Sequence, residues 1–262
     1  MRLAYRDTGG EGPPLLVLHG FMGSTGAMAG LVDALSLDRR VVAVDLIGHG
    51  ASPAPRELAP YRTDAMVQQV REVLDEVGLG VVDAVGYSMG ARLALSIVAS
   101  TPALVRRLAL ISGTPGIADD ADRESRIGDD AGLADSLERD GLEAFVDRWE
   151  QFPMFASQRQ LPSAVQESIR AGRLAQREGG LANSLRGFGT GSMPPLWEGL
   201  GRIATPTLAI AGELDPKYAA IAGKLEEAMP AARAKVIASV GHATHIENPS
   251  ATIDALRDHF DQ

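Results

Sequence analysis

The sequence "DAVGYSMGARLALSIVAS", residues 83–100, places a serine between two glycines at the junction of two different patterns. Its first part is an apolar run typical of a buried strand, and its second part has the composition of a helix. Glycines on either side of "YSM" permit a tight turn between the two, so Ser88 stands clear at the head of the helix, where backbone N–H groups stabilise negative charge. The pattern predicts a nucleophilic serine, and the plainer alternative is a glycine-rich turn with a capping serine.

Short β-rich apolar runs recur along the chain with helical patterns between them. The expected strands lie at 14–20, 40–45, 81–88, 107–112, 206–212 and 234–239. The expected helices lie at 26–37, 63–78, 89–100, 216–229 and 249–260, with Thr63 and either Asn248 or Ser250 as N-caps. This alternation predicts an α/β fold in which helices flank both faces of a mostly parallel sheet.

The alternation stops between residues 112 and 206. Helical segments replace it, after an acidic opening "ADDADRESRIGDD" at 118–130. This part of the chain holds both tryptophans, Trp149 and Trp197, and several arginines but no lysine. We therefore expect a helical cap at 115–200, inserted into a core formed by 1–114 and 201–262.

Length and composition limit the class of protein. With 262 residues, 45% apolar and 23% charged, the chain is expected to form one large domain with an insertion. Its formal net charge of −9 disfavours nucleic acid and anionic membranes as partners. Cysteine is absent, and no signal peptide or run of ~20 apolar residues occurs, so we expect a cytoplasmic protein. The oligomeric state is not indicated.

Ser88 needs two partners, because a serine hydroxyl reacts only when an imidazole takes its proton and a carboxylate orients that imidazole. With a turn of this type the carboxylate and then the histidine follow later strands in the chain. "AIAGELDPKY" places Asp215 after one expected strand, and "IASVGHATHIENP" places His242 after the next. Glu213 is an alternative acid, and His245 is an alternative base.

The loop "LHGFMGS", residues 18–24, supplies a further element of such a site. It can present the backbone N–H of Phe21 to a developing oxyanion, and the N–H of Met89 would be the second donor. The remaining histidines and one acid have structural explanations instead. Asp45 is expected to stabilise the turn into "GHG", His19 and His49 to support strand-end loops, and His259 to be solvated or in the core.

Arg92 lies four residues after Ser88, one turn further along the same face of the expected helix. An unpaired buried cation is unfavourable, so Arg92 either pairs with a protein carboxylate or binds an anionic ligand.

These motifs resemble the α/β-hydrolase fold over nearly the whole chain outside the cap. The cap is more specific. "WEQFPMFA" (149–156) and "LANSLRGFGTGSMPPLW" (181–197), together with "GYSMGARLAL" (86–95), resemble the 2-succinyl-6-hydroxy-2,4-cyclohexadiene-1-carboxylate synthases of menaquinone biosynthesis. Ala91 in place of a common glycine and "GHATH" in place of a GHN-type sequence depart from that family, and so do Phe188 and Met193, which stand at family-variable positions. None of these departures removes a chemical group.

The resemblance implies an α/β-hydrolase fold with a helical cap inserted after the sixth strand. It also implies a carbon–oxygen lyase, which eliminates pyruvate from 2-succinyl-5-enolpyruvyl-6-hydroxy-3-cyclohexene-1-carboxylate without metal or cofactor. Ser88 would be the base, relayed to His242 and oriented by Asp215. The substrate is a small polycarboxylate, and the residues implied to bind it are Arg92, Arg126, Arg173, Trp149 and Tyr87, with Arg123 as an alternative to Arg126.

Two other classes of function remain open from the sequence. A serine hydrolase acting on an ester or carbon–carbon bond of a carboxylated substrate would use the same three residues. A non-catalytic sensor of small molecules would keep the pocket without turnover. The glycine-rich "RGFGTGS" at 186–192 lacks the lysine and the preceding strand of a phosphate loop, and no metal-binding motif occurs.

Overall fold

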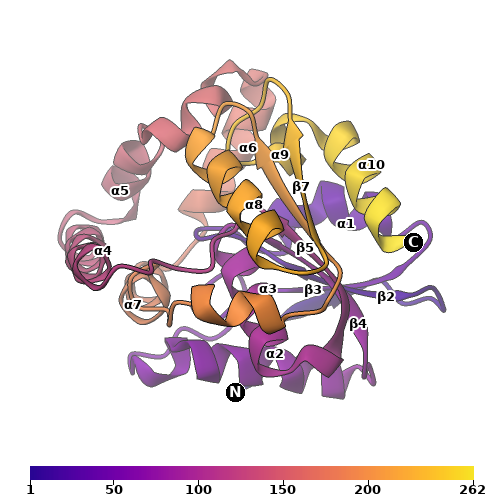
Figure 1. Ribbon diagram of the computed structural model, residues 1–262. Coiled ribbons are helices and arrows are strands. Elements are labelled where there is room, and N and C mark those ends of the chain that lie inside the picture. Colours follow the sequence, from indigo (N-terminus) through magenta and orange to yellow (C-terminus); the bar gives the residue numbers. More distant parts are fainter.

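Seven strands form one sheet, in the order β1–β3–β2–β4–β5–β6–β7, in the computed structural model, which describes residues 1–262 (Figure 1). All neighbouring strands are parallel except β1 and β3. The strands are β1 Tyr5–Asp7, β2 Pro14–Leu18, β3 Arg40–Val44, β4 Val82–Tyr87, β5 Val105–Ile111, β6 Thr207–Gly212 and β7 Ala232–Ile237. The expected α/β fold is confirmed. Only β1 was missed, because its three residues contain no apolar run.

Helices cover both faces of this sheet (Figure 1). One face carries α2 (Thr63–Glu76), α3 (Met89–Ser100) and α8 (Pro216–Ala228), and the other carries α1 (Ala29–Leu35) and α10 (Pro249–Phe260). Successive residues of a strand point to opposite faces, so Leu16 packs in the first layer and its neighbour Leu15 in the second. Because both faces are covered, β2 to β5 are apolar throughout much of their length.

The helices start close to where the sequence predicts, although one of the expected caps is wrong. Asn248 caps α10, since its side chain accepts a hydrogen bond from the amide of Ala251 at 3.1 Å. Thr63 does not cap α2. The carbonyl of Arg62 accepts the first helical bond, from the Met66 amide, so Thr63 is already inside the helix and its hydroxyl has no hydrogen-bond partner.

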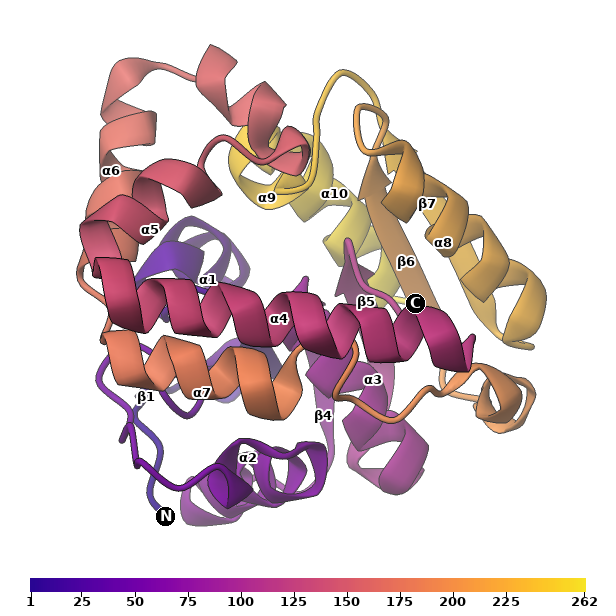
Figure 2. The ribbon, with the colours of Figure 1, turned by 90° about the vertical axis from the view of Figure 1, so that its left-hand side faces the viewer.

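The cap consists of four helices between β5 and β6, which are α4 (Asp120–Asp140), α5 (Leu142–Trp149), α6 (Ser163–Leu174) and α7 (Glu178–Phe188). α4 and α7 run side by side (Figure 2), and Leu137, Phe145 and Leu181 contribute to a separate small apolar core. The insertion follows the fifth strand and not the sixth, because only β1 to β5 precede it in the chain. The boundaries at 115 and 200 stay a prediction, and the four helices fall within them.

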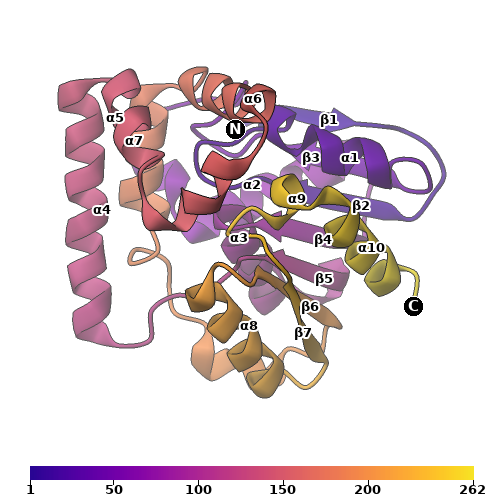
Figure 3. The same ribbon diagram turned by 90° about the horizontal axis from the view of Figure 1, so that it is seen from above.

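Short elements complete the chain. They are α9 (Thr244–Glu247) and the 3-10 helices η1 (Gly26–Met28), η2 (Ala59–Tyr61), η3 (Pro102–Leu104), η4 (Pro153–Gln160) and η5 (Trp197–Arg202). Seen from above, α4 to α7 lie together at one end of the molecule (Figure 3). No helix combines the length and the apolar character needed to cross a membrane.

Candidate active site

Ser88 occupies a strained turn between the last residue of β4 and the first residue of α3. Its φ of 50° lies in the left-handed region, which L-residues adopt only where the surroundings enforce it. The flanking glycines allow this geometry. A Cβ at Gly86 would collide with the carbonyl of Gly90, and a Cβ at Gly90 would collide with the carbonyl of Leu18. The turn therefore needs both glycines for close backbone approach, and it leaves the Ser88 hydroxyl free to face the cap.

The structure brings together the three residues that the sequence singled out. His242 Nε2 lies 3.0 Å from Ser88 Oγ, and His242 Nδ1 lies 2.7 Å from an oxygen of Asp215. Asp215 and His242 are both buried. The hydroxyl of Ser112 donates to the His242 carbonyl at 2.7 Å and thereby holds the loop that carries the imidazole. The arrangement can take a proton from the serine and stabilise the imidazolium that results.

Neither alternative partner occupies this relay. Glu213 accepts a hydrogen bond from the amide of Ser239 at 2.8 Å and so supports a neighbouring turn. The His245 ring packs against that of Tyr87 in a tilted arrangement, with ring centroids 4.5 Å apart, and its Nδ1 atom has no hydrogen-bond partner. Burial lowers the pKa of His245 to about 3, so this imidazole is neutral at pH 7.

The other histidines and Asp45 lie within loops and packed layers. His19 Nε2 accepts from the amide of Leu46 at 2.9 Å, and the Asp45 carboxylate accepts from the amides of Thr25 and Ala51. His49 is completely buried, and burial lowers its pKa to about 3. His259 Nε2 lies 2.9 Å from the Leu108 carbonyl. These contacts agree with structural roles.

Two backbone amides near Ser88 are available to a ligand. The amide of Phe21 donates to no other group of the chain. Met89 is the first residue of α3, so its amide has no acceptor within its own helix. Both residues line the cavity together with Ser88. A pair of fixed N–H donors beside the serine is the arrangement that stabilises a developing oxyanion.

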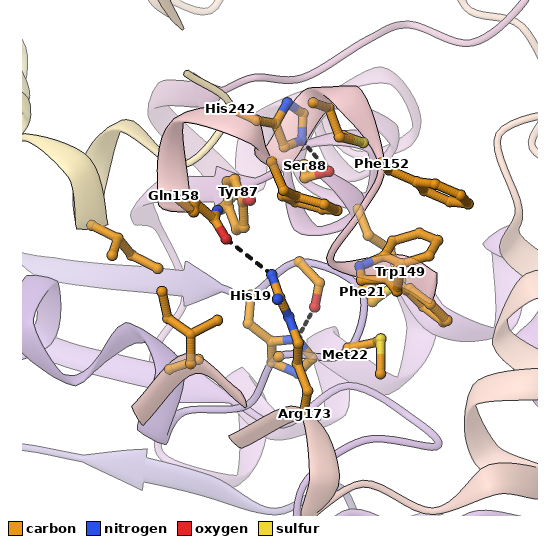
Figure 4. Close-up of a pocket in the computed structure, with 18 of the residues that line it drawn as sticks. His19, Phe21, Met22, Tyr87, Ser88, Trp149, Phe152, Gln158, Arg173 and His242 are labelled. Carbon is orange, nitrogen blue, oxygen red and sulfur yellow. Dashed lines mark hydrogen bonds between the residues drawn. The ribbon is translucent and has the colours of Figure 1, made fainter. Parts of the chain in front are cut away.

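A cavity of about 1070 Å³ lies between the core and the cap. Figure 4 shows Ser88, His242 and Tyr87 on one side of it and an aromatic group around Trp149 on another. The Trp149 ring lies 5.2 Å from the ring of Phe21 and 5.0 Å from that of Phe152, measured between centroids. The volume suits an organic molecule of several rings or chains, and its walls are part aromatic and part charged.

Arg92 is buried in this cavity wall without a carboxylate partner. One of its guanidinium nitrogens donates to the Phe188 carbonyl at 2.8 Å, and the guanidinium lies 4.7 Å from the centroid of the Phe188 ring. Burial lowers the pKa of Arg92 to about 10, which still leaves it charged at pH 7. Of the two explanations for this residue, pairing with a protein carboxylate does not apply to this structure.

Arg126, and not Arg123, lines the cavity. Arg126 Nε donates to Asp130 at 2.9 Å, one turn further along α4. Arg123 is directed to its own helix start, where it donates to Asp120 at 2.5 Å and to the carbonyl of Ile117 at 3.3 Å. Of the two arginines, Arg126 is therefore the one placed to reach a ligand in the cavity, and its role as a carboxylate ligand stays a prediction.

Arg173 approaches the cavity from α6. It donates to Glu150 at 3.0 Å and to the side chain of Gln158 at 3.1 Å, and its guanidinium lies 5.0 Å from the centroid of the Phe155 ring. Figure 4 shows Gln158 and Arg173 pointing toward one another.

Several lining residues were missed by sequence analysis, among them Gln158, Phe152 and Tyr218. Gln158 and Phe152 belong to the cap, and Tyr218 stands at the start of α8, with its ring centroid 4.6 Å from that of His242. Gln158 belongs to no motif, whereas the "DPKY" following the expected strand at 206–212 was a signal for Tyr218, because it places the tyrosine three residues after Asp215. No group of three or more histidine, aspartate or glutamate side chains is arranged to hold a metal ion.

The parallel sheet, the strained serine turn and the serine–histidine–aspartate geometry define the class of protein: the chain belongs to the α/β-hydrolase fold, whose family model matches residues 13–249. A Klebsiella pneumoniae (strain MGH 78578) protein, named 2-succinyl-6-hydroxy-2,4-cyclohexadiene-1-carboxylate synthase, is 32% identical over 253 residues, which cover 95% of each chain. A Bacillus subtilis (strain 168) protein provisionally given the same name is 41% identical over 250 residues, covering 95% of this chain and 91% of that one.

Comparison with solved structures leads to the same group. MenH from S. aureus has a TM-score of 0.94 and 32% identity to this chain, covering 99% of this chain and 98% of that one. Within the α/β-hydrolase fold, the chain belongs to the 2-succinyl-6-hydroxy-2,4-cyclohexadiene-1-carboxylate synthase family. The resemblance stated from the sequence is thus confirmed.

Proposed function

We propose that this enzyme eliminates pyruvate from 2-succinyl-5-enolpyruvyl-6-hydroxy-3-cyclohexene-1-carboxylate, which yields 2-succinyl-6-hydroxy-2,4-cyclohexadiene-1-carboxylate in menaquinone biosynthesis. The named relatives support this activity. The observation that carries it is the position of Arg92: a buried, charged guanidinium without a carboxylate partner lines the same cavity as the Ser88 hydroxyl and its proton relay. A substrate with several carboxylates gives that cation its missing partner.

The proton relay accounts for the first step. His242 Nε2 takes the Ser88 hydroxyl proton, and the serine oxygen removes the proton on the carbon next to the succinyl ketone. The electron pair of that C–H bond moves onto the ketone, whose oxygen becomes an enolate. The amides of Phe21 and Met89 stabilise this charge, and Asp215 stabilises the imidazolium.

The second step breaks the carbon–oxygen bond. The enolate electrons form a ring double bond from the deprotonated carbon to its ring neighbour, the existing ring double bond shifts to the carbon that bears the enolpyruvyl group, and the enolpyruvyl oxygen leaves with the electron pair of the C–O bond. The pyruvate enolate then takes a proton, which returns through Ser88 from His242, so the relay ends as it began. The elimination needs neither a water molecule nor a covalent intermediate, and its products are the cyclohexadiene and pyruvate.

The charged side chains of the cavity suit the ends of such a substrate. Its carboxylates lie on the ring, the succinyl chain and the enolpyruvyl group, and the cavity offers Arg92, Arg126 and Arg173 from the three helices α3, α4 and α6. Arginine binds a carboxylate with two parallel N–H groups and so fixes orientation as well as charge. We assign these arginines to substrate binding, with Trp149 and Tyr87 packing against the ring.

A serine hydrolase is the second candidate, because the same relay and the same free amides would serve an acyl-enzyme. The deciding experiment measures pyruvate release from the enolpyruvyl cyclohexene, beside hydrolysis of a neutral p-nitrophenyl ester and a protein-free control for spontaneous decay. Fast pyruvate release with little ester cleavage supports the lyase. Ester cleavage without accelerated pyruvate release refutes it, and a ligand that binds tightly but is never turned over indicates a sensor.

Ser88→Ala in the same assay isolates the base. We expect turnover to fall by roughly a thousandfold or more while substrate still binds. Ser100→Ala, at an exposed position on the same helix, is the matched control and keeps full activity. A Ser88→Ala variant within tenfold of the wild type would show that another group removes the proton. The expected cytoplasmic location stays a prediction that cell fractionation checks.

A further inference from the structure

The three arginines of the cavity differ in their protein partners. Arg92 has no carboxylate, Arg126 pairs with Asp130 of its own helix, and Arg173 pairs with Glu150, which directly follows α5. A substrate carboxylate can join Arg92 at once. At the other two arginines it meets a carboxylate of the protein.

Asp130 is fixed to its arginine. Its side chain is 1% exposed, and the oxygen that does not contact Arg126 has no hydrogen-bond partner. That oxygen is enclosed by the backbone at Gly189, where a Cβ would collide with it. Separation from Arg126 would therefore leave a buried and unpaired carboxylate, which is strongly unfavourable.

Glu150 is held differently. Its side chain is 24% exposed, and its second oxygen already lies 3.1 Å from Arg170. Arg170 also contacts Asp147 at 2.7 Å, so it stays in place whichever way Glu150 turns. Glu150 can leave Arg173 and still keep a cationic partner and contact with water. Of the two paired arginines, Arg173 is thus the one whose partner can be exchanged at low cost.

Glu150 and a substrate carboxylate would also reach Arg173 from opposite sides. Phe155, Gln158 and Arg173 form a wall, because they line both the main cavity and a smaller outer groove of about 310 Å³. Glu150 lines the outer groove only. It therefore binds Arg173 from outside the cavity, whereas a substrate would bind from inside.

We infer that Glu150 is an exchangeable counter-ion, which a substrate carboxylate replaces on Arg173 while Glu150 moves fully to Arg170. The geometry gives the exchange a consequence for specificity. Before a ligand binds, Arg92 is the only one of the three cavity arginines without a protein carboxylate. A ligand with one carboxylate is satisfied there, and only a ligand with a second carboxylate within reach of Arg173 gains from the exchange. The identity of that ligand rests on the proposed function.

The test compares two stable probes by titration calorimetry. 2-(3-Carboxypropanoyl)benzoate has the ring carboxylate and the succinyl chain of the proposed product, and 2-butanoylbenzoate lacks the terminal carboxylate. The variants are Glu150→Gln, Arg170→Gln, the double variant, and Glu167→Gln. Glu167 is the matched control, because it lines the same outer groove and makes no ion pair.

The inference predicts effects of opposite sign. Glu150→Gln should tighten binding of the dicarboxylate by about twofold to fivefold, the range of a partly exposed ion pair, and change monocarboxylate binding less. Arg170→Gln should weaken dicarboxylate binding, because Glu150 then has only Arg173. The double variant should resemble Glu150→Gln, and Glu167→Gln should resemble the wild type.

Weaker dicarboxylate binding by Glu150→Gln, or equal changes for both probes, would overturn the exchange and make Glu150 a residue that only positions Arg173. KM for pyruvate release gives a second readout of the same comparison and should fall in Glu150→Gln. A wild type that releases no pyruvate would refute the proposed function. A wild type that releases pyruvate beside a Glu150→Gln variant with unchanged or raised KM would refute the exchange alone.

Discussion

Arg92, on the core helix α3, donates a hydrogen bond to the carbonyl of Phe188, the last residue of the cap helix α7, at 2.8 Å. A helix ends with partial negative charge on its free carbonyls, so this contact stabilises the guanidinium without neutralising it. The ring of Phe188 adds a cation–π contact at 4.7 Å. The cation is thereby held in position with its full charge available to a ligand.

Replacement of Arg92 by methionine should separate binding from stability. Affinity for the carboxylated substrate should fall by more than about thirtyfold, the loss expected when one partner of a buried charge pair is removed. The free energy of unfolding should not fall, because the substitution removes an unpaired buried cation and keeps the apolar stem. KM for the substrate and chemical denaturation measure the two effects.

The control for that variant is Arg123→Met, which alters a cap arginine outside the cavity and should leave KM unchanged. Hydrolysis of a neutral ester gives a further check. An Arg92→Met variant that loses ester turnover to the same degree as pyruvate release would point to a structural role for Arg92.

Asp215→Asn should reduce kcat by roughly a thousandfold, since an amide can present an N–H to His242 Nδ1 and favour the wrong tautomer of the imidazole. Glu213→Gln, two residues earlier, should change kcat by less than about tenfold because Glu213 contacts the amide of Ser239 and not the relay. Single-turnover rates of pyruvate release compare the two. The reverse ranking would assign the acid to Glu213.

Gly90→Ala should destabilise the fold by several kcal/mol, about 3 or more, because its Cβ meets the carbonyls of Leu18 and His19, which are fixed in the sheet and the loop after it. Gly30→Ala is the matched substitution in a helix, at a glycine with open space around its Cβ position, and should stabilise by about 0.5–1 kcal/mol. Urea denaturation measures both. Equal stability of the two variants would contradict the close packing behind Ser88.

Stability should fall in acid because of His49. Burial, and after it the charges of His19 and Arg177, lower the pKa of His49 to about 3 in the folded protein. In the unfolded chain this pKa is near 6.5. Between those values the unfolded state binds more protons, so the contribution of His49 is complete above pH 6.5 and is lost as the pH falls toward 3. The slope is about 1.4 kcal/mol per pH unit for one such histidine.

Denaturation of the wild type and of His49→Gln at pH 7, 6, 5 and 4 tests this. At pH 7 the free energy of unfolding of His49→Gln should be lower than or equal to that of the wild type. On acidification it should decrease less than that of the wild type. Parallel curves for the two proteins would mean that other groups, such as the buried His245, dominate the acid transition.

The sequence was informative where function depends on local order along the chain. Ser88, Asp215 and His242 could be found because each stands on the loop or turn that follows a strand, and parallel strands bring their carboxyl ends to one edge of the sheet. The short distances between these three side chains follow from the fold. Thr63 was assigned wrongly as the cap because Arg62, which follows a short 3-10 helix, occupies the N-cap position, and its side-chain type gives no sign of that role.

Pairings across the cap could not be predicted. Glu150 and Arg173 are 23 residues apart and meet because η4 turns the chain between α5 and α6. Arg123 and Arg126 are the same residue type on one helix, so the sequence does not distinguish them. The packing of α4 on α7 decides that Arg126 faces the cavity. Such contacts depend on helix packing angles, which a single sequence leaves open.

The insertion of the cap between β5 and β6 divides the cavity residues between two parts of the chain. The proton relay, both free amides, Arg92 and Tyr87 come from the α/β core, whereas Arg126, Arg173 and Trp149 come from one continuous segment. Replacement of the cap at its two junctions with the core would present different substrates to the same catalytic residues. Evolution and protein engineering can therefore change the substrate specificity of such a protein without changing its catalytic residues.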